Sequence, residues 1–145
     1  TVSIWHQTGK SQQQEVLAAY AGVTGARVDA FIEDMSAAYS WADVVVCRAG
    51  AMTVSEIAAV GLPAIFIPFP HAIDDHQTAN AMSLVNEGAA MLIQQHDMTA
   101  KKLVSMINAL QNDPSKRQQM AKAAARQGIR DAADKVMQSC LEVAR

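Results

Sequence analysis

Residues 43–63 constrain the fold more than any other stretch, because they read as a strand, a glycine turn and a helix in direct succession. The short apolar, β-branched run at 44–47 is typical of a strand buried on both faces. Thr53 and Glu56 form a Thr-x-x-Glu capping box, which predicts the start of a helix. A strand that runs through Gly50 into a helix leaves free backbone N–H groups and the positive end of a helix dipole beside a crevice. That geometry favours a bound phosphate.

The rest of the chain alternates between strand-like and helix-like segments. We predict further strands at 2–7, 27–32, 64–68 and 90–93, and further helices at 11–20, 35–41, 75–87, 99–110, 114–127 and 131–143. This alternation predicts βαβ units, and therefore an α/β fold with a Rossmann-like, mostly parallel sheet flanked by helices. The length of 145 residues is that of one domain, so we expect a single domain over 1–145 with a helical C-terminal tail from about residue 114.

Composition excludes several classes of protein. Half of the residues are hydrophobic, 18% are charged and the net charge is −2, so nothing indicates a nucleic-acid partner. The apolar runs are too short to span a bilayer. The two cysteines, Cys47 and Cys140, do not form a disulfide framework, and Cys47 lies in a predicted buried strand as an inert small hydrophobe. The chain starts within a strand pattern and without Met, which we interpret as a piece of a longer protein.

The turn at 48–53 is the first candidate site, because ligands of parallel sheets bind beyond the carboxyl ends of the strands. The N–H groups of Ala51, Met52 and Thr53 are suited to hold a diphosphate, with Gly50 permitting close approach and Arg48 adding positive charge. An ordinary strand–helix connection without a ligand explains the turn equally simply, and on the turn alone it is the favoured interpretation.

Glu56 has two interpretations. A carboxylate one turn into a phosphate-binding helix accepts hydrogen bonds from both hydroxyls of a ribose, as acidic residues do in dinucleotide-binding folds. Alternatively, Glu56 only completes the capping box with Thr53. The pattern does not decide between them.

The loop and helix start at 71–80 form the second candidate site. Gln77 and Asn80 are three residues apart and share a helix face, so their amides are suited to bind sugar hydroxyls. Capping by an aspartate and solvation of the other side chains is the alternative. Three possible metal donors lie here as well, but no recognised ligand spacing links them: His71, Asp75 and His76. We therefore predict no metal and no cofactor.

Six segments together resemble a known family. They are residues 5–10, 31–35, 42–56, 61–64, 68–71 and 75–81. In this order they are similar to the C-terminal domain of the MurG family, bacterial glycosyltransferases of peptidoglycan synthesis. The family transfers N-acetylglucosamine from UDP-GlcNAc to undecaprenyl-linked lipid I and forms lipid II. The resemblance runs from the first residues to about residue 90, and the helical tail is similar only in general character.

The resemblance implies a role for each candidate residue. The family has two Rossmann-like domains around a cleft, the GT-B arrangement, and its C-terminal domain binds the UDP-sugar. By similarity, the backbone of Ile32 would pair with uracil, the turn at 51–53 would hold the diphosphate and Glu56 would hold the ribose. His76 and Gln77 would contact the GlcNAc hydroxyls, without any active-site metal. The family acts at the cytoplasmic face of the inner membrane as a peripheral protein.

The sequence departs from the family pattern in three respects. The N-terminal domain, which carries the acceptor site, the membrane face and the candidate catalytic base, has no counterpart in residues 1–145. We therefore predict that these residues alone do not catalyse the transfer. A first strand with its glycine- and serine-rich loop is also lacking, which predicts a gap or exposed edges in the sheet and self-association. Some relatives carry Gln where this chain has His76.

Two other functions fit part of the pattern. A related UDP-sugar enzyme, such as a UDP-GlcNAc 2-epimerase, would share the glycine turn and Glu56 but would not need the run at 75–81. The other is a non-catalytic nucleotide-binding or interaction module, in which residues 1–145 would be a stand-alone protein; the abrupt start of the sequence argues against it.

Overall fold

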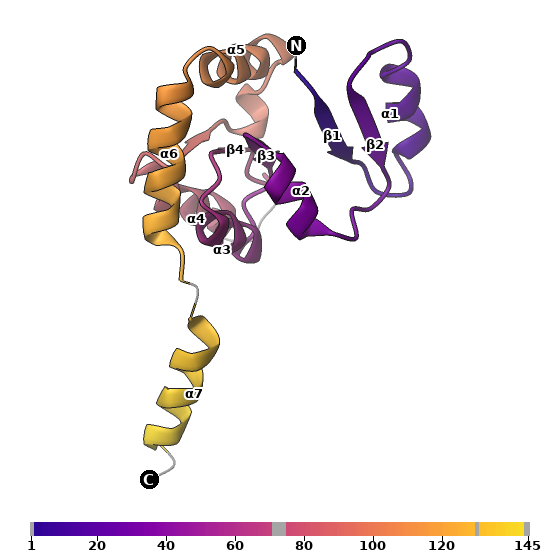
Figure 1. Ribbon diagram of the computed structural model, residues 1–145. Coiled ribbons are helices and arrows are strands. Elements are labelled where there is room, and N and C mark those ends of the chain that lie inside the picture. Colours follow the sequence, from indigo (N-terminus) through magenta and orange to yellow (C-terminus); the bar gives the residue numbers. More distant parts are fainter. Residues whose placement is uncertain (1, 71–74, 130, 144–145) are drawn as a thin grey trace. The chain divides into compact units, whose positions relative to one another are not determined.

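The computed structural model describes residues 2–70, 75–129 and 131–143, which form two compact units, Thr1–Ala42 and Asp43–Arg145 (Figure 1). Whether residues 1–145 behave as the single domain expected from their length stays a prediction.

The first unit contains two parallel strands and two helices. Its order is β1 (Ile4–Gln7), α1 (Gln13–Ala19), β2 (Ala26–Asp29) and α2 (Met35–Trp41). An aromatic and charged cluster joins the two strands, because the indole N–H of Trp5 donates to Asp29 Oδ2 at 2.7 Å and the Arg27 guanidinium lies 3.9 Å from the centre of the Trp5 ring. Helix α2 begins where the Asp34 carboxylate accepts a hydrogen bond from the Ala37 N–H at 2.8 Å, as an N-cap does.

The second unit alternates strands with helices and ends in three consecutive helices. Its order is β3 (Val45–Cys47), α3 (Ala51–Val60), β4 (Ala64–Phe66), α4 (His76–Val85), β5 (Ala90–Leu92), the 3₁₀ helix η2 (Gln95–Asp97), α5 (Ala100–Gln111), α6 (Pro114–Gln127) and α7 (Ala132–Val143). The strand–helix alternation follows the predicted βαβ pattern.

The described strands form two parallel sheets, β1-β2 in the first unit and β3-β4-β5 in the second. In the second sheet Val45 pairs with Ala64 and Ala64 with Ala90, so the carboxyl ends of all three strands lie at one edge. The predicted α/β fold with parallel strands and flanking helices is confirmed. The described strands are divided between two sheets, and the gap expected from a missing first strand stays a prediction.

The core of the second unit is built around β4. All three of its residues are fully buried, which explains why 64–66 lacks the alternation of a half-exposed strand. Ile65 packs in a buried cluster with Ile93, Leu110 and Met120, the last two from α5 and α6. Helices α5 and α6 therefore pack against the sheet.

Helices α3 and α6 approach each other closely at Gly61. This residue ends α3 in the left-handed conformation, with φ of 76°, which favours glycine. A Cβ placed there would lie 3.0 Å from the Ala125 Cβ of α6, so both backbone conformation and space require glycine.

Most element bounds differ from the predicted ones by one or two residues. The strand predicted at 27–32 ends at Asp29, so Ile32 follows the strand and does not belong to it. The short helix η2 was not predicted. Helices α2 and α6 have the predicted bounds, since Asp34 and Asp113 cap them with their own side chains.

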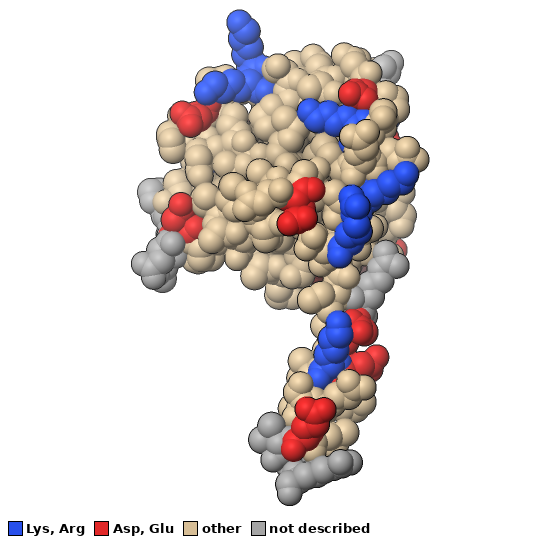
Figure 2. All heavy atoms as spheres, turned by 90° about the vertical axis from the view of Figure 1, so that its left-hand side faces the viewer, with Lys and Arg blue, Asp and Glu red and all other residues tan. Residues whose placement is uncertain are grey.

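Acidic and basic side chains are interspersed over the face of the molecule that Figure 2 shows. This mixture agrees with the low net charge and with the absence of a basic run in the sequence. Within the described residues, no helix combines the length and apolar character that crossing a bilayer requires.

Candidate functional site

The N-terminus of α3 is the centre of the candidate site. Gly50 is the N-cap and gives the helix no side-chain cap, and the first hydrogen bond of the helix runs from the Val54 N–H to the Gly50 carbonyl at 3.0 Å. The three preceding N–H groups, of Ala51, Met52 and Thr53, have no hydrogen-bond partner in the described part of the chain. They lie at the carboxyl edge of β3, together with the positive end of the helix dipole.

The predicted capping box is wrong. Thr53 is the third residue of α3 and Glu56 the sixth, so Thr53 cannot be the N-cap. The helix begins three residues earlier than the Thr-x-x-Glu pattern indicates, because Ala51 and Met52 both favour helix and Gly50 supplies the extended backbone before it. Glu56 therefore lies one turn further from the helix start, exposed, and engaged in an interaction within the protein.

Gly50 is not required by the protein's own packing. Its φ of −62° and ψ of 148° are available to any residue. A Cβ at this position would meet only the Thr53 Oγ1, at 3.9 Å. The space beside Gly50 is thus open, and a group that approaches the N–H groups of α3 would fill it.

Arg48 binds protein carbonyls. Its Nη1 donates to the carbonyl oxygens of Ile67 and Pro68, both at 3.2 Å, and its guanidinium lies 5.6 Å from the centre of the Phe69 ring. Arg48 therefore fastens the segment that follows β4 to the turn that follows β3.

Gln77 and Asn80 bind the same residue of that turn, Ala49. Gln77 Oε1 accepts hydrogen bonds from the N–H groups of Ala49, at 3.2 Å, and Phe69, at 3.0 Å. Asn80 Nδ2 donates to the Ala49 carbonyl at 3.1 Å. As predicted, the two amides share one face of α4, and that face lies against the turn before α3.

The start of α4 is held by further side chains. Asp75 precedes the helix in the left-handed conformation, with φ of 51°, and accepts a 2.7 Å hydrogen bond from the Thr78 hydroxyl. The Gln94 amide donates to the same hydroxyl at 3.0 Å. His76 is exposed at the first position of α4 and interacts with another group of the protein. His71 lies outside the described residues.

Ile32 belongs to the first unit, in the segment after β2. It is buried, and its N–H donates to Gln7 Oε1 at 2.8 Å. A base that paired with both backbone groups of Ile32 would have to replace this contact. The other nine predicted site residues all lie in the second unit: Arg48, Gly50, Ala51, Met52, Thr53, Glu56, His76, Gln77 and Asn80.

Cys47 ends β3 next to this site. Burial raises the pKa of its thiol to about 12, so the thiol stays protonated at neutral pH and is a poor nucleophile. This agrees with the inert role predicted for it. Among the described residues, no cluster of His, Cys, Asp and Glu side chains is able to hold a metal ion.

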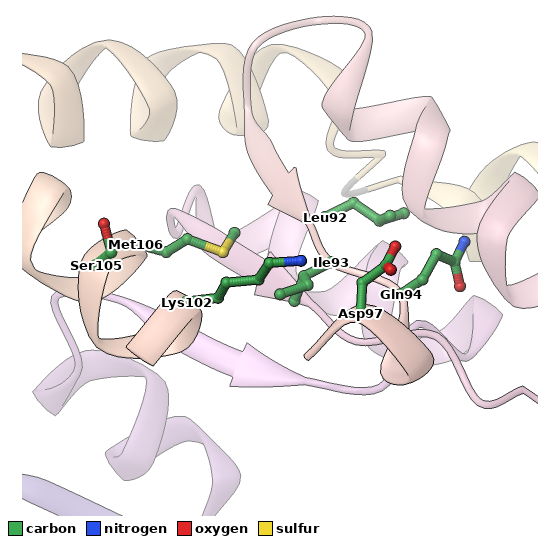
Figure 3. A pocket seen from close by; sticks show the side chains of 7 residues that line it. All are labelled: Leu92, Ile93, Gln94, Asp97, Lys102, Ser105 and Met106. Carbon is green, nitrogen blue, oxygen red and sulfur yellow. The ribbon is translucent and has the colours of Figure 1, made fainter. Parts of the chain in front are cut away.

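A separate hollow of about 400 Å³ lies beyond β5 (Figure 3). It is lined by Leu92, Ile93, Gln94, Asp97, Lys102, Ser105 and Met106. None of these is a predicted site residue. Gln94, one of its lining residues, donates the hydrogen bond to the Thr78 hydroxyl of α4.

Comparison with known families shows which family the chain belongs to. Residues 1–136 match the family described as "Glycosyltransferase family 28 C-terminal domain". The chain belongs to the glycosyltransferase 28 C-terminal domain family. This confirms the predicted resemblance to the C-terminal domain of the MurG family.

Similar members of the family are much longer than this chain. The chain is 49% identical over 147 aligned residues to a protein of Shewanella sp. (strain MR-4) named UDP-N-acetylglucosamine--N-acetylmuramyl-(pentapeptide) pyrophosphoryl-undecaprenol N-acetylglucosamine transferase. That alignment covers 99% of the chain and 41% of the relative. The chain thus spans about two fifths of the length of the curated relatives that it matches.

Two solved structures share the family fold. The crystal structure of Acinetobacter baumannii MurG matches with a TM-score of 0.90 and 40% identity, over 97% of this chain and 43% of that one. The glycotransferase of kitacinnamycin matches with a TM-score of 0.67 and 25% identity, over 94% of this chain and 34% of that one.

No pattern in the sequence indicated one residue that organises the candidate site. Ala49 is fully buried, and both of its backbone polar groups are bound by side chains of α4. An alanine carries no chemical signal, and its partners are 28 and 31 residues away in sequence. Only the paired spacing of Gln77 and Asn80 gave an indication that this face of α4 is used.

Proposed function

We propose that this chain is the donor-binding part of an enzyme that transfers N-acetylglucosamine from UDP-GlcNAc to lipid I, forming lipid II. The observation that carries the proposal is the open N-terminus of α3, with three N–H groups left unbound, in a chain of this glycosyltransferase family. The relative with 49% identity bears the name of such a transferase. No feature favours the epimerase or the non-catalytic module over this function.

The diphosphate of the donor is assigned to the turn before α3. The N–H groups of Ala51, Met52 and Thr53 donate to phosphate oxygens, and the open space beside Gly50 admits them. The charge that develops on the departing UDP as the glycosidic bond breaks is stabilised by these N–H groups and by the helix dipole. A metal is not needed for this purpose.

The two ends of the donor are assigned to flanking residues. Glu56 accepts hydrogen bonds from the ribose hydroxyls, and the backbone of Ile32 binds uracil after Gln7 releases the N–H. The amide ends of Gln77 and Asn80 that do not bind Ala49, together with His76, contact the sugar. Arg48 supports the site by holding the segment after β4 and does not bind phosphate directly.

Isothermal titration calorimetry with UDP, UDP-GlcNAc and UDP-GalNAc tests the proposal. We expect UDP and UDP-GlcNAc to bind, and UDP-GalNAc to bind more weakly than UDP-GlcNAc because one hydroxyl has the opposite configuration. Glu56→Ala should weaken all three ligands. The matched control is Glu87→Ala, which removes an exposed carboxylate outside the site and should change none of the three affinities.

A titration in which UDP and UDP-GlcNAc both fail to bind would overturn the donor assignment. Binding of UDP with equal affinity for UDP-GlcNAc and UDP-GalNAc would retain the nucleotide site but overturn the sugar assignment.

Catalysis is proposed to need residues beyond these 145. We assign no general base among the described residues of the site, and the acceptor, lipid I, is expected to bind outside this chain. The whole protein would then act as a peripheral protein on the cytoplasmic face of the inner membrane. Formation of lipid II by residues 1–145 alone, measured with UDP-GlcNAc and lipid I, would contradict this division of labour.

A further inference from the structure

Ala49 is the residue through which α4 controls the start of α3. It is fully buried, and it directly precedes Gly50 and the three open N–H groups. Buried backbone groups must be hydrogen-bonded, and here side chains satisfy both groups. The N–H of Ala49 donates to Gln77 Oε1 and its carbonyl accepts from Asn80 Nδ2.

These contacts fix the orientation of both amides. Gln77 Oε1 faces two N–H donors, of Ala49 and Phe69, and an NH₂ group in its place would meet two donors without an acceptor. Asn80 Nδ2 faces a carbonyl, where an oxygen would be repelled. The ends that remain for a ligand are therefore a donor, Gln77 Nε2, and an acceptor, Asn80 Oδ1.

We propose that Gln77 and Asn80 are positioning residues, which hold the backbone of Ala49 and thereby set the α3 N–H groups in place for the diphosphate. This inference rests on the proposed function, because it assumes that the diphosphate binds at α3. It adds a role that sugar contact alone does not include: the two amides determine affinity for UDP, a ligand without a sugar. The same contact couples the sugar side of the site to its phosphate side.

Two substitutions that each add one negative charge distinguish the positioning role from an effect of charge alone. Gln77→Glu keeps an oxygen facing the two N–H donors, so the contact with Ala49 persists. Asn80→Asp places an oxygen against the Ala49 carbonyl, so that contact is lost and replaced by repulsion. Both variants add one negative charge to α4, three residues apart, and at pH 8 both carboxylates are ionised. Any difference between them therefore reports the Ala49 contact and not the added charge.

We expect the Kd for UDP of the Asn80→Asp protein to be about tenfold higher than that of the Gln77→Glu protein, as the loss of one hydrogen bond predicts. Amide hydrogen exchange gives a second measurement that needs no ligand. The Ala49 N–H should exchange about tenfold faster in Asn80→Asp than in the unsubstituted protein, and at an unchanged rate in Gln77→Glu. Ser83→Ala removes an exposed hydroxyl that donates to the backbone carbonyl of Asn80, and this variant should change neither measurement.

Three outcomes would overturn the proposal. If both variants bind UDP equally, the contact with the Ala49 carbonyl does not control affinity. If Asn80→Asp weakens UDP-GlcNAc but leaves UDP unchanged, the amides serve the sugar alone. If Ala49 exchange is unchanged in Asn80→Asp, the turn is held by other contacts. Failure of the unsubstituted protein to bind UDP would instead count against the proposed function, and the exchange comparison would still decide whether these amides hold the turn.

Discussion

Helices α3 and α6 pack against each other, yet they begin in opposite ways. At α6 the Asp113 carboxylate accepts a 2.8 Å hydrogen bond from the Lys116 N–H, and Pro114 at the first helical position has no N–H to satisfy. At α3 the N-cap is Gly50, no side chain caps the helix, and three N–H groups stay unbound in the described part of the chain.

We interpret the capped start of α6 as a contribution to stability and the uncapped start of α3 as a feature that serves binding. The start of α6 is closed by its own sequence, which is sufficient for a helix that only supports the core. The start of α3 is left open, at a cost in helix stability of only a few tenths of a kcal/mol relative to an Asp or Asn cap, because glycine is itself a tolerated N-cap. We interpret the open start as the part of the site that binds the diphosphate, and four experiments test this comparison.

Closing α3 should have the largest effect. In Gly50→Asp the new carboxylate can cap the helix by accepting from the N–H of Met52 or Thr53, and the backbone and the space at Gly50 both permit it. We expect the Kd for UDP to rise at least about 100-fold, because the carboxylate occupies the donors and repels the phosphates, while the free energy of unfolding stays equal or rises by a few tenths of a kcal/mol. Calorimetry and chemical denaturation measure the two quantities.

Gly50→Asn is the matched control for charge, since it caps a helix as well as Asp does. It should also weaken UDP, but less than Gly50→Asp. Retention of UDP affinity in a stabilised Gly50→Asp protein would contradict the assignment of the diphosphate to α3.

Removing Glu56, the proposed ribose ligand, should have the next largest effect. We expect Glu56→Ala to raise the Kd for UDP at least about tenfold, since hydrogen bonds to charged groups contribute about 1.5–3 kcal/mol. Measuring 2′-deoxy-UDP completes a double-mutant cycle. The unsubstituted protein should prefer UDP over 2′-deoxy-UDP, and Glu56→Ala should lose most of that preference. Equal preference in both proteins would show that Glu56 does not touch the ribose.

The two helix starts also show when the first residue of a helix can be predicted from the sequence. At α6 the cap and the proline are adjacent in sequence, so Asp113 and Pro114 alone determine the bound, and the prediction is confirmed. At α3 two starts compete, and Gly50 with the helix-forming Ala51 and Met52 prevails over the Thr53 pattern. Local signals are reliable where a single one is present.

The contacts that build the candidate site are a different matter, since they join residues far apart in sequence. Arg48 reaches carbonyls 19 and 20 residues away, and the N–H of Ile32 is bound by a side chain 25 residues earlier. Which residues gather at the carboxyl edge of the sheet follows from the fold pattern. What each side chain binds depends on tertiary packing, which no spacing rule contains.

The observed cap of α6, Asp113, and the residue predicted to cap α3, Thr53, can be compared by how much their substitution changes the free energy of unfolding. Asp113→Ala should lower the free energy of unfolding by about 1 kcal/mol, because it removes the side-chain cap of α6. Thr53→Ala should change it by less than about 0.5 kcal/mol, since Thr53 is an interior residue of α3 and alanine is the better helix former. Urea denaturation of both variants measures the difference. A loss from Thr53→Ala as large as that from Asp113→Ala would restore the capping role that the sequence predicted for Thr53.

The smallest effect is expected at Arg48, and it tests whether the open start of α3 binds phosphate without help from a side-chain charge. The guanidinium is already bound by the carbonyls of Ile67 and Pro68. Arg48→Lys and Arg48→Met should therefore bind UDP with Kd values within about twofold of each other, because both lose the two-carbonyl contact and only one keeps the charge. Calorimetry at low and high salt compares them. If Arg48→Lys retains affinity and Arg48→Met loses about tenfold, with the difference shrinking in salt, the charge of Arg48 contacts the diphosphate and backbone N–H groups alone do not explain binding at α3.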